Sequence, residues 1–168
     1  LIFTDEALRT FETRYKMNPP IRSDIHRDAC VEGLKDGTID AVVTDHAPHE
    51  WEEKDQEFNL APSGFVGLET SVGAMLTHLY HTGIIDLMSL VNVMSTAQAK
   101  ILNLDAGVIA PGKDADLTFL DLDKEWTVDS SKFYSKGKST PFDEMIFKGK
   151  AAATIVNGKF VMKNGEVL

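Results

Sequence analysis

The hydrophobic pattern of residues 1–104 predicts helices around one buried strand. Residues 4–14 predict a short helix, and residues 23–36 predict a longer one that ends at Gly37. The buried stripe expected on the longer helix consists of Ile25, Ala29, Cys30 and Leu34. The branched, apolar run 39–44 then predicts a buried strand. A helix that leads into a buried strand through a glycine turn indicates an α/β protein with a parallel sheet.

A long loop and further helices follow this strand. Residues 45–64 connect the two parts, and a loop of that length is unusual in a compact domain unless it is functional. The acidic middle of the loop, residues 50–57, predicts a solvated face. Residues 67–81 predict a helix, and residues 86–102 predict another that is broken near Ser95-Thr96. The apolar side expected on the first of these helices consists of Leu68, Val72, Met75, Leu76 and Leu79.

From residue 105 onward the pattern changes to β. The predicted strands are residues 117–120, 126–128, 153–156 and 159–162. Asn157-Gly158 lies between the last two strands and is typical of a two-residue hairpin turn. We therefore expect two parts, an α/β part at residues 1–104 and a small β part at residues 105–168.

Composition narrows the classes of function. The chain of 168 residues carries a formal net charge of −9, which argues against nucleic acid and against an anionic membrane as partners. No apolar run approaches the roughly 20 residues needed to span a bilayer. The single Cys30 excludes an internal disulfide and fits a reducing compartment, so we expect a cytoplasmic protein with a buried thiol at this position.

The candidate chemistry lies directly after the predicted strand, in Thr44-Asp45-His46-Ala47-Pro48-His49. Asp45 can simply cap the loop, or it can bind a metal and transfer a proton, since carboxylates do both in hydrolytic sites. His46 fits a structural role best, whereas His49 lies farther along the loop and can meet an anionic ligand. The paired cysteines and the H-E-x-x-H pattern of common zinc sites are absent.

Two residues outside this hexapeptide are also candidates for a site. Asn18 precedes a double proline, and its amide can satisfy a turn or bind a cyclic amide. Gly64 can be a turn residue, or it can let a substrate approach backbone N–H groups closely. The three remaining histidines, His26, His78 and His81, are predicted to lie on the surface.

These residues belong to a set of sequence blocks that occur together in one family. The blocks are Tyr15-Lys16-Met17-Asn18-Pro19-Pro20-Ile21-Arg22, Asp36-Gly37-Thr38-Ile39-Asp40, Thr44-Asp45-His46-Ala47-Pro48-His49, Ala61-Pro62-Ser63-Gly64-Phe65-Val66-Gly67-Leu68-Glu69-Thr70, Gly107-Val108-Ile109-Ala110-Pro111-Gly112-Lys113-Asp114-Ala115-Asp116-Leu117 and Ser139-Thr140-Pro141-Phe142. In this order they resemble the C-terminal part of the long bacterial dihydroorotases of the amidohydrolase superfamily. Hydantoinases and allantoinases share the Asp-His pair, but the Ala-Pro-His continuation and the Asn-Pro-Pro block are more similar to dihydroorotase.

The resemblance implies a fold and a set of roles. It implies the C-terminal part of a (β/α)8 barrel, with residues 1–104 as its last strand-helix units, plus part of a small β-sandwich domain. Asp45 then matches a zinc ligand that also shuttles a proton. Asn18 matches a substrate-binding asparagine, and His49 matches a histidine that contacts the substrate carboxylate. Gly64, with Ser63 beside it, matches the backbone that binds the ring, although Ser63 replaces a bulkier residue.

The resemblance also implies a reaction and partners. The expected reaction is the reversible hydrolysis of dihydroorotate to N-carbamoyl-aspartate in pyrimidine synthesis, with two Zn2+ in a complete site. The other zinc ligands of the family have no counterpart here, and the chain begins with leucine, so we expect an incomplete fragment that is inactive alone. A homodimer or a complex with aspartate carbamoyltransferase is the expected assembly. Two alternatives stay open: a non-catalytic subunit that scaffolds this partner, and a cyclic amidohydrolase for hydantoin or allantoin.

Overall fold

The computed structural model describes residues 1–168, which form two compact units. The first unit consists of Leu1–Asp36, Thr44–Ser71 and Thr127–Ile146. The second unit consists of Gly37–Val43, Val72–Trp126 and Phe147–Leu168. Each unit therefore joins segments that lie far apart in the sequence.

The first unit begins with short 3-10 turns rather than with the predicted α-helix. Two 3-10 helices span Asp5–Thr10 and Thr13–Tyr15, and Phe11 between them adopts a left-handed conformation with φ 55°. A bulky residue at positive φ interrupts helical hydrogen bonding, so the predicted helix 4–14 is wrong in type and is split. The remaining helices of this unit are α1 (Asp24–Asp36), α2 (Trp51–Lys54) and a 3-10 turn at Ser130–Lys132.

Helix α1 forms where predicted, but its expected buried stripe does not. Leu34 is buried, whereas Ile25 is 76% exposed and Cys30 is exposed as well. The reason is that no other segment of the chain covers the face that carries Ile25, Ala29 and Cys30. The prediction of a buried thiol at Cys30 is therefore wrong for this chain.

Aromatic rings and two valines form the interior of the first unit. The ring of Phe142 lies 5.2 Å from that of Phe3 and 6.3 Å from that of Phe65, measured between centroids. Val66 and Val128 are fully enclosed beside them, at 2% and 1% exposure. This packing holds the segment around Phe65 in place.

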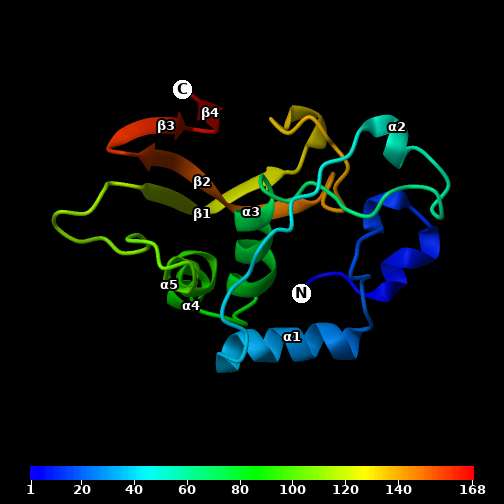
Figure 1. Cartoon of the computed structure of the whole chain (residues 1–168), viewed down its shortest axis with the longest axis horizontal. Helices are drawn as coiled ribbons and strands as arrows, with labels where there is room; N and C mark the ends of the chain where they lie inside the picture. Colours follow the sequence, from blue (N-terminus) through cyan, green and yellow to red (C-terminus); the bar gives the residue numbers. More distant parts are fainter. The chain divides into compact units, whose positions relative to one another are not determined.

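Helices and a four-stranded sheet make up the second unit (Figure 1). The helical elements are α3 (Ser71–Met75), a π-helical turn at Leu76–Tyr80, α4 (Leu87–Val91), a π-helical turn at Asn92–Thr96 and α5 (Ala97–Ile101). The predicted break near Ser95-Thr96 does not occur, because the second π turn continues the helix between α4 and α5. None of the helices combines the length and the apolar character that a membrane crossing requires.

The sheet confirms strands at residues 117–120, 153–156 and 159–162, whereas residues 126 and 127 continue the first of these strands and form no strand of their own. It consists of β1 (Leu117–Thr127), β2 (Ile146–Val156), β3 (Lys159–Lys163) and β4 (Glu166–Val167), which lie side by side in that order. Strands β2 and β3 are antiparallel, with Val156 opposite Lys159. The turn between them places Asn157 at φ 49° and Gly158 at φ 75°, which is the left-handed geometry that an Asn-Gly hairpin needs.

The predicted buried strand 39–44 is absent. These residues form no ladder, and Val43 is 75% exposed. A parallel strand needs neighbouring strands to complete its hydrogen bonds, and no other strand of this chain lies beside the segment. Instead, Val42 N–H donates to the carbonyl of Val93 at 2.9 Å, and the Gln98 amide donates to the carbonyl of Val42 at 2.5 Å.

The core of the second unit lies where the helical segment meets strand β2. Phe147 and Leu76 are both fully buried, at 0% exposure. Gly149 permits this contact, because a Cβ atom there would lie 2.5 Å from Leu76 Cδ1. Thr77 Oγ1 also accepts a hydrogen bond from the N–H of Lys148 at 2.9 Å. The predicted apolar face therefore packs as expected at Leu76, while Leu68 remains 60% exposed, before the start of α3.

Two of the three histidines predicted on the surface are partly buried. His26 is exposed as expected. His81 is half-buried, and its Nε2 lies 2.8 Å from the carbonyl of Leu122. The Nε2 atom of His78 is buried without a hydrogen-bond partner, and its ring packs edge-on against Phe147, with 5.9 Å between centroids. Burial lowers the pKa of His78, because the charged imidazolium loses its hydration.

This burial predicts a pH-dependent stability. The pKa of His78 is lower in the folded state than its ordinary value of 6.5, so between those two values only the unfolded state binds the proton. The free energy of unfolding should fall as pH falls through this window. A His78→Gln variant should lose less Tm than the unaltered protein between pH 7 and pH 5. His26→Gln is the matched control and should behave like the unaltered protein; equal losses in all three would contradict the assignment.

Candidate functional site

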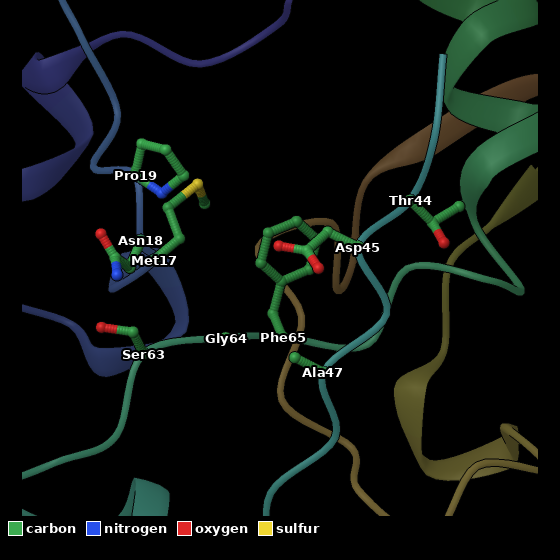
Figure 2. A pocket seen from close by; sticks show the side chains of 9 residues that line it. All are labelled: Met17, Asn18, Pro19, Thr44, Asp45, Ala47, Ser63, Gly64 and Phe65. Carbon is green, nitrogen blue, oxygen red and sulfur yellow. The ribbon is translucent and has the colours of Figure 1, made fainter. Parts of the chain in front are cut away.

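Three segments of the first unit enclose a pocket (Figure 2). The cavity has a volume of about 460 Å3, which lies in the range of small-molecule sites. Its lining residues are Met17, Asn18, Pro19, Thr44, Asp45, Ala47, Ser63, Gly64 and Phe65. Four of the five residues proposed for the site from sequence, Asn18, Asp45, Ser63 and Gly64, are therefore brought together.

Two of the pocket segments touch backbone to backbone. The N–H of Ala47 donates to the carbonyl of Phe65 at 3.0 Å. Gly64 lies against Ala47 so closely that an added Cβ would be 2.7 Å from the Ala47 Cβ. Its φ of 127° also lies in the region that side chains disfavour. Glycine at position 64 is therefore required for the two segments to meet.

His46 also links these two segments. Its Nδ1 lies 3.1 Å from the N–H of Gly67 and 3.4 Å from that of Leu68. Both partners are donors, so Nδ1 acts as the acceptor and the ring proton resides on Nε2. The structure thus gives His46 the structural role that the sequence favoured.

The Asp45 carboxylate is free of partners. The residue adopts a left-handed conformation with φ 45°, is exposed, and makes no hydrogen bond or ion pair with the rest of the chain. Figure 2 shows its carboxylate extending across the pocket toward the side on which Met17 and Asn18 lie. The loop-capping role is not seen, because the side chain caps nothing. An unpaired carboxylate at a pocket wall is instead available to a ligand, a metal or a proton.

Asn18 and Ser63 form the opposite wall. Both are exposed, and neither side chain has a hydrogen-bond partner in the chain. Figure 2 places the two polar side chains near each other, on different segments. The amide and the hydroxyl can both donate and accept, so this wall suits a ligand with carbonyl and N–H groups.

The backbone at positions 63 to 65 offers donors, but Gly64 is not one of them. The N–H of Gly64 donates to the carbonyl of Lys16 at 2.9 Å and is therefore occupied. The N–H groups of Ser63 and Phe65 have no partner in the chain. Among the three pocket residues of this segment, Ser63 and Phe65 carry the free donors, and Gly64 supplies the close approach.

His49 lies behind the pocket wall rather than in its lining. Its Nε2 is 3.0 Å from the carbonyl of Ser63, and its Nδ1 is 3.2 Å from the Glu53 carboxylate. The His49 ring thus lies between helix α2 and the backbone of Ser63. A protonated ring would donate to both oxygens.

Two lysines contact the backbone near Ser63, and neither was among the site residues predicted from sequence. Lys54 is only 3% exposed, and its ammonium donates to the carbonyls of Pro62 at 3.0 Å and Gly64 at 2.9 Å. The Lys16 ammonium donates to the carbonyl of Phe58 at 2.6 Å. Burial lowers the pKa of Lys54, and the nearby charge of Lys16 adds to this effect.

The prediction that residues 50–57 form a solvated face is therefore wrong at Lys54. It is the only basic residue in an acidic run, and that was the one signal that could have drawn attention to it.

The residues of this chain do not fit a complete metal site. A catalytic zinc needs three protein ligands, and no group of three His, Cys, Asp or Glu side chains gathers anywhere in residues 1–168. Asp45 fits as one donor, because its carboxylate is unpaired and faces the pocket. The other donors of such a site are not among these residues.

Solved structures define the class of protein. The chain superimposes on the L-hydantoinase (dihydropyrimidinase) of Arthrobacter aurescens with a TM-score of 0.93 and 37% identity, over 99% of this chain and 38% of that one. It also matches the dihydropyrimidinase of Brevibacillus agri with a TM-score of 0.91 and 25% identity, over 100% and 38% of the two chains. The fold is that of the C-terminal portion of a barrel-type hydrolase, as the sequence predicted.

The sequence comparison gives the family. The model of the amidohydrolase family matches residues 8–161, and the chain belongs to that family. It is 51% identical to the dihydroorotase of Citrifermentans bemidjiense over 94% of this chain, and 44% identical to that of Bacillus subtilis over 100%. The chain spans 37% and 39% of the lengths of these two relatives.

The close contact at Gly64 predicts a loss of stability when a side chain is added there. Gly64→Ala should destabilise the chain by about 1–3 kcal/mol or more, because it combines a disfavoured φ with a steric clash. Gly37→Ala is the matched control, since Gly37 has φ 81° but nothing within 4 Å of an added Cβ. Urea unfolding should show a larger loss at position 64 than at position 37, and equal losses would contradict the close contact.

Proposed function

We propose that this chain is the C-terminal part of a dihydroorotase, which hydrolyses the ring amide of dihydroorotate reversibly to N-carbamoyl-aspartate. One observation carries the proposal: the unpaired Asp45 carboxylate faces the unpaired Asn18 amide and Ser63 hydroxyl across one pocket. Two residues of the pocket lining, Ser63 and Phe65, also have unpaired N–H groups. A cyclic amide with a carboxylate needs such donors and acceptors, together with a group that moves a proton. The likeness to dihydroorotases at 44% to 51% identity supports the substrate.

Asp45 is the proposed acid and base. It takes a proton from the attacking water and delivers it to the ring nitrogen as the amide bond breaks. Asn18 holds the ring amide through its own amide, and the backbone N–H groups beside Gly64, together with Ser63, bind ring oxygens. His49 is proposed for the substrate carboxylate, which accepts a stronger hydrogen bond than the Ser63 carbonyl that the ring now faces.

Asp45 is also proposed as one ligand of a zinc site, with two Zn2+ in the complete protein. Metal-dependence is general in the amidohydrolase family, and a bound metal would polarise the amide carbonyl and acidify water. Because one carboxylate cannot hold a catalytic zinc, we expect residues 1–168 alone to bind zinc weakly and to show little turnover. Zinc content per chain, measured on the isolated 168 residues and on the complete protein, provides a readout that does not depend on activity.

The remaining assignments concern the surroundings of this site. We propose that residues 1–104 belong to the barrel and residues 105–168 to the β-domain of the complete protein. A homodimer or a complex with aspartate carbamoyltransferase is its proposed assembly, and the cytoplasm is its proposed location. A free Cys30 fits a reducing compartment.

A second ring substrate has an observation in its favour. The match to an L-hydantoinase, with a TM-score of 0.93, makes a hydantoin the alternative. Assay of the complete protein with dihydroorotate, hydantoin and allantoin separates these substrates. A kcat/KM at least about tenfold higher for dihydroorotate than for the other two rings supports the proposal, and a preference for hydantoin overturns it. Turnover of no ring at all would favour a non-catalytic scaffold.

Removal of the proton-transfer group should abolish most turnover. In the complete protein, Asp45→Asn keeps the shape of the side chain but not its basicity, so kcat should fall about 100-fold or more. Asp40→Asn is the matched control, since Asp40 is exposed on the same segment and does not line the pocket. Steady-state kinetics with dihydroorotate measures both variants, and near-normal turnover by Asp45→Asn would sink the assignment.

The binding residues should act mainly on KM. Asn18→Ala removes neutral hydrogen bonds and should raise KM about 2- to 10-fold, and His49→Ala removes a partner of an anion and should raise it about tenfold or more. His26→Ala, at an exposed position, serves as control. Unchanged steady-state constants in either variant would remove that residue from the proposed site.

A further inference from the structure

Lys54 is a buried cation whose charge no carboxylate balances. Its residue is 3% exposed, and its ammonium makes two hydrogen bonds, both to backbone carbonyls. The neighbouring charge is positive as well, because Lys16 lies close enough to lower the pKa of Lys54. Burial of an ammonium without an anion is costly, so a residue of this kind needs a reason beyond packing.

The two carbonyls that Lys54 binds flank Ser63. One belongs to Pro62, in the peptide unit that ends at the N–H of Ser63, and the other belongs to Gly64, in the unit that ends at the N–H of Phe65. Both peptide bonds are trans, because the only cis bond of the chain is Asn18-Pro19. In a trans peptide the C=O and the N–H point in opposite directions. Lys54 therefore turns two carbonyls toward itself and two N–H groups away from itself.

Those two N–H groups are the unpaired ones. Neither Ser63 nor Phe65 donates to any group of the chain, and both residues line the pocket, whereas Lys54 does not. The intervening peptide unit is fixed the other way round, since the Ser63 carbonyl faces His49 Nε2 at 3.0 Å and the Gly64 N–H donates to Lys16. Without a ligand, each peptide unit from Pro62 to Phe65 is thus held by a residue that does not line the pocket.

A second effect follows from the charge of Lys54. A hydrogen bond from an ammonium to a carbonyl polarises the whole peptide unit, which makes its N–H a stronger donor. Lys54 therefore orients the N–H groups of Ser63 and Phe65 and also makes them stronger hydrogen-bond donors. Groups of this kind suit a ligand with negative or partly negative oxygen atoms.

We propose that Lys54 is a positioning residue that aims the N–H groups of Ser63 and Phe65 at a carboxylate or amide oxygen of the substrate. This inference rests on the proposed function for the identity of the substrate, but its structural part stands on the described contacts. Lys54 does not contact the ligand itself. It acts through the backbone of residues 62–65.

The test replaces Lys54 in the complete, metal-loaded protein. Lys54→Met removes the charge and both hydrogen bonds, so KM for dihydroorotate should rise at least about tenfold while kcat changes less than about threefold. Lys35→Met is the matched control, because Lys35 is an exposed lysine that pairs with Glu32 at 2.7 Å. A folded Lys54→Met protein with an unchanged KM overturns the proposal.

Restoring an ammonium at position 54 distinguishes a positioning role of Lys54 from a role in packing. Lys54→Cys treated with 2-bromoethylamine regains an ammonium of almost the same length, and its KM should return to within about threefold of that of the unaltered protein after the same treatment. Treatment of the unaltered protein also controls for modification of Cys30, which is exposed. If Lys54→Met does not fold, Lys54→Gln, which keeps neutral donors, takes its place. Failure of both to fold would show a purely structural role and overturn the proposal.

Hydrogen exchange tests whether Lys54 orients this backbone, even if dihydroorotate is not the substrate. Loss of Lys54 should speed exchange of the Gly64 amide at least about tenfold, because its orientation depends on the same wall, while the amides of α1 keep their rates. Unchanged exchange at Gly64 overturns the role of Lys54. Absence of turnover by the unaltered protein, with faster exchange in the variant, overturns the proposed function alone.

Discussion

The pocket depends on the close approach of residues 44–49 to residues 63–68. Ala47 and Phe65 share a backbone hydrogen bond, Gly64 lies against Ala47, and the His46 ring accepts from the amide of Gly67. A side chain at position 64 would separate the segments. Asp45 lies next to this contact in a left-handed conformation, with its carboxylate exposed at the pocket and free of partners. Without the contact between the two segments, the Asp45 carboxylate would not face Asn18 and Ser63 across the pocket.

The second feature of the site is the way its backbone is held. Lys54, His49 and Lys16 each bind a group of the segment 62–64 from outside the pocket. The Lys54 ammonium thereby binds the carbonyls of Pro62 and Gly64, and the His49 ring faces the carbonyl of Ser63. The N–H groups of Ser63 and Phe65 remain for a ligand. The result is a pocket with an acceptor on one side and donors on the other, which suits an amide ring that must be bound and also exchange a proton. A metal site built on Asp45 would still require donors from outside residues 1–168.

Local chemistry made several features predictable from sequence. The Asn157-Gly158 hairpin forms because both residues tolerate positive φ. The helix predicted at residues 86–102 also forms, although a π turn at Asn92–Thr96 continues it where a break was expected. The sequence also brought Asn18, Asp45 and Gly64 forward as candidates, and the structure places them around one cavity. The features that failed depend on partners far away in the sequence. Residues 39–44 lack a neighbouring strand, and no segment of the chain covers the face of α1 that carries Cys30.

The burial of Lys54 was not predictable for a different reason. Its partners, the carbonyls of Pro62 and Gly64, are backbone groups that every residue has, so no sequence pattern marks them. The orientation of a carbonyl is a property of the folded loop.

The most direct test of this account is a crystal structure of the complete protein with dihydroorotate or N-carbamoyl-aspartate bound. We expect the ligand in the pocket between Asp45 and Asn18, with the N–H groups of Ser63 and Phe65 within about 3 Å of its oxygen atoms. We also expect the Asp45 carboxylate to lie beside the amide that reacts. A ligand bound elsewhere, or an Asp45 carboxylate turned away to pair with another part of the protein, would contradict it.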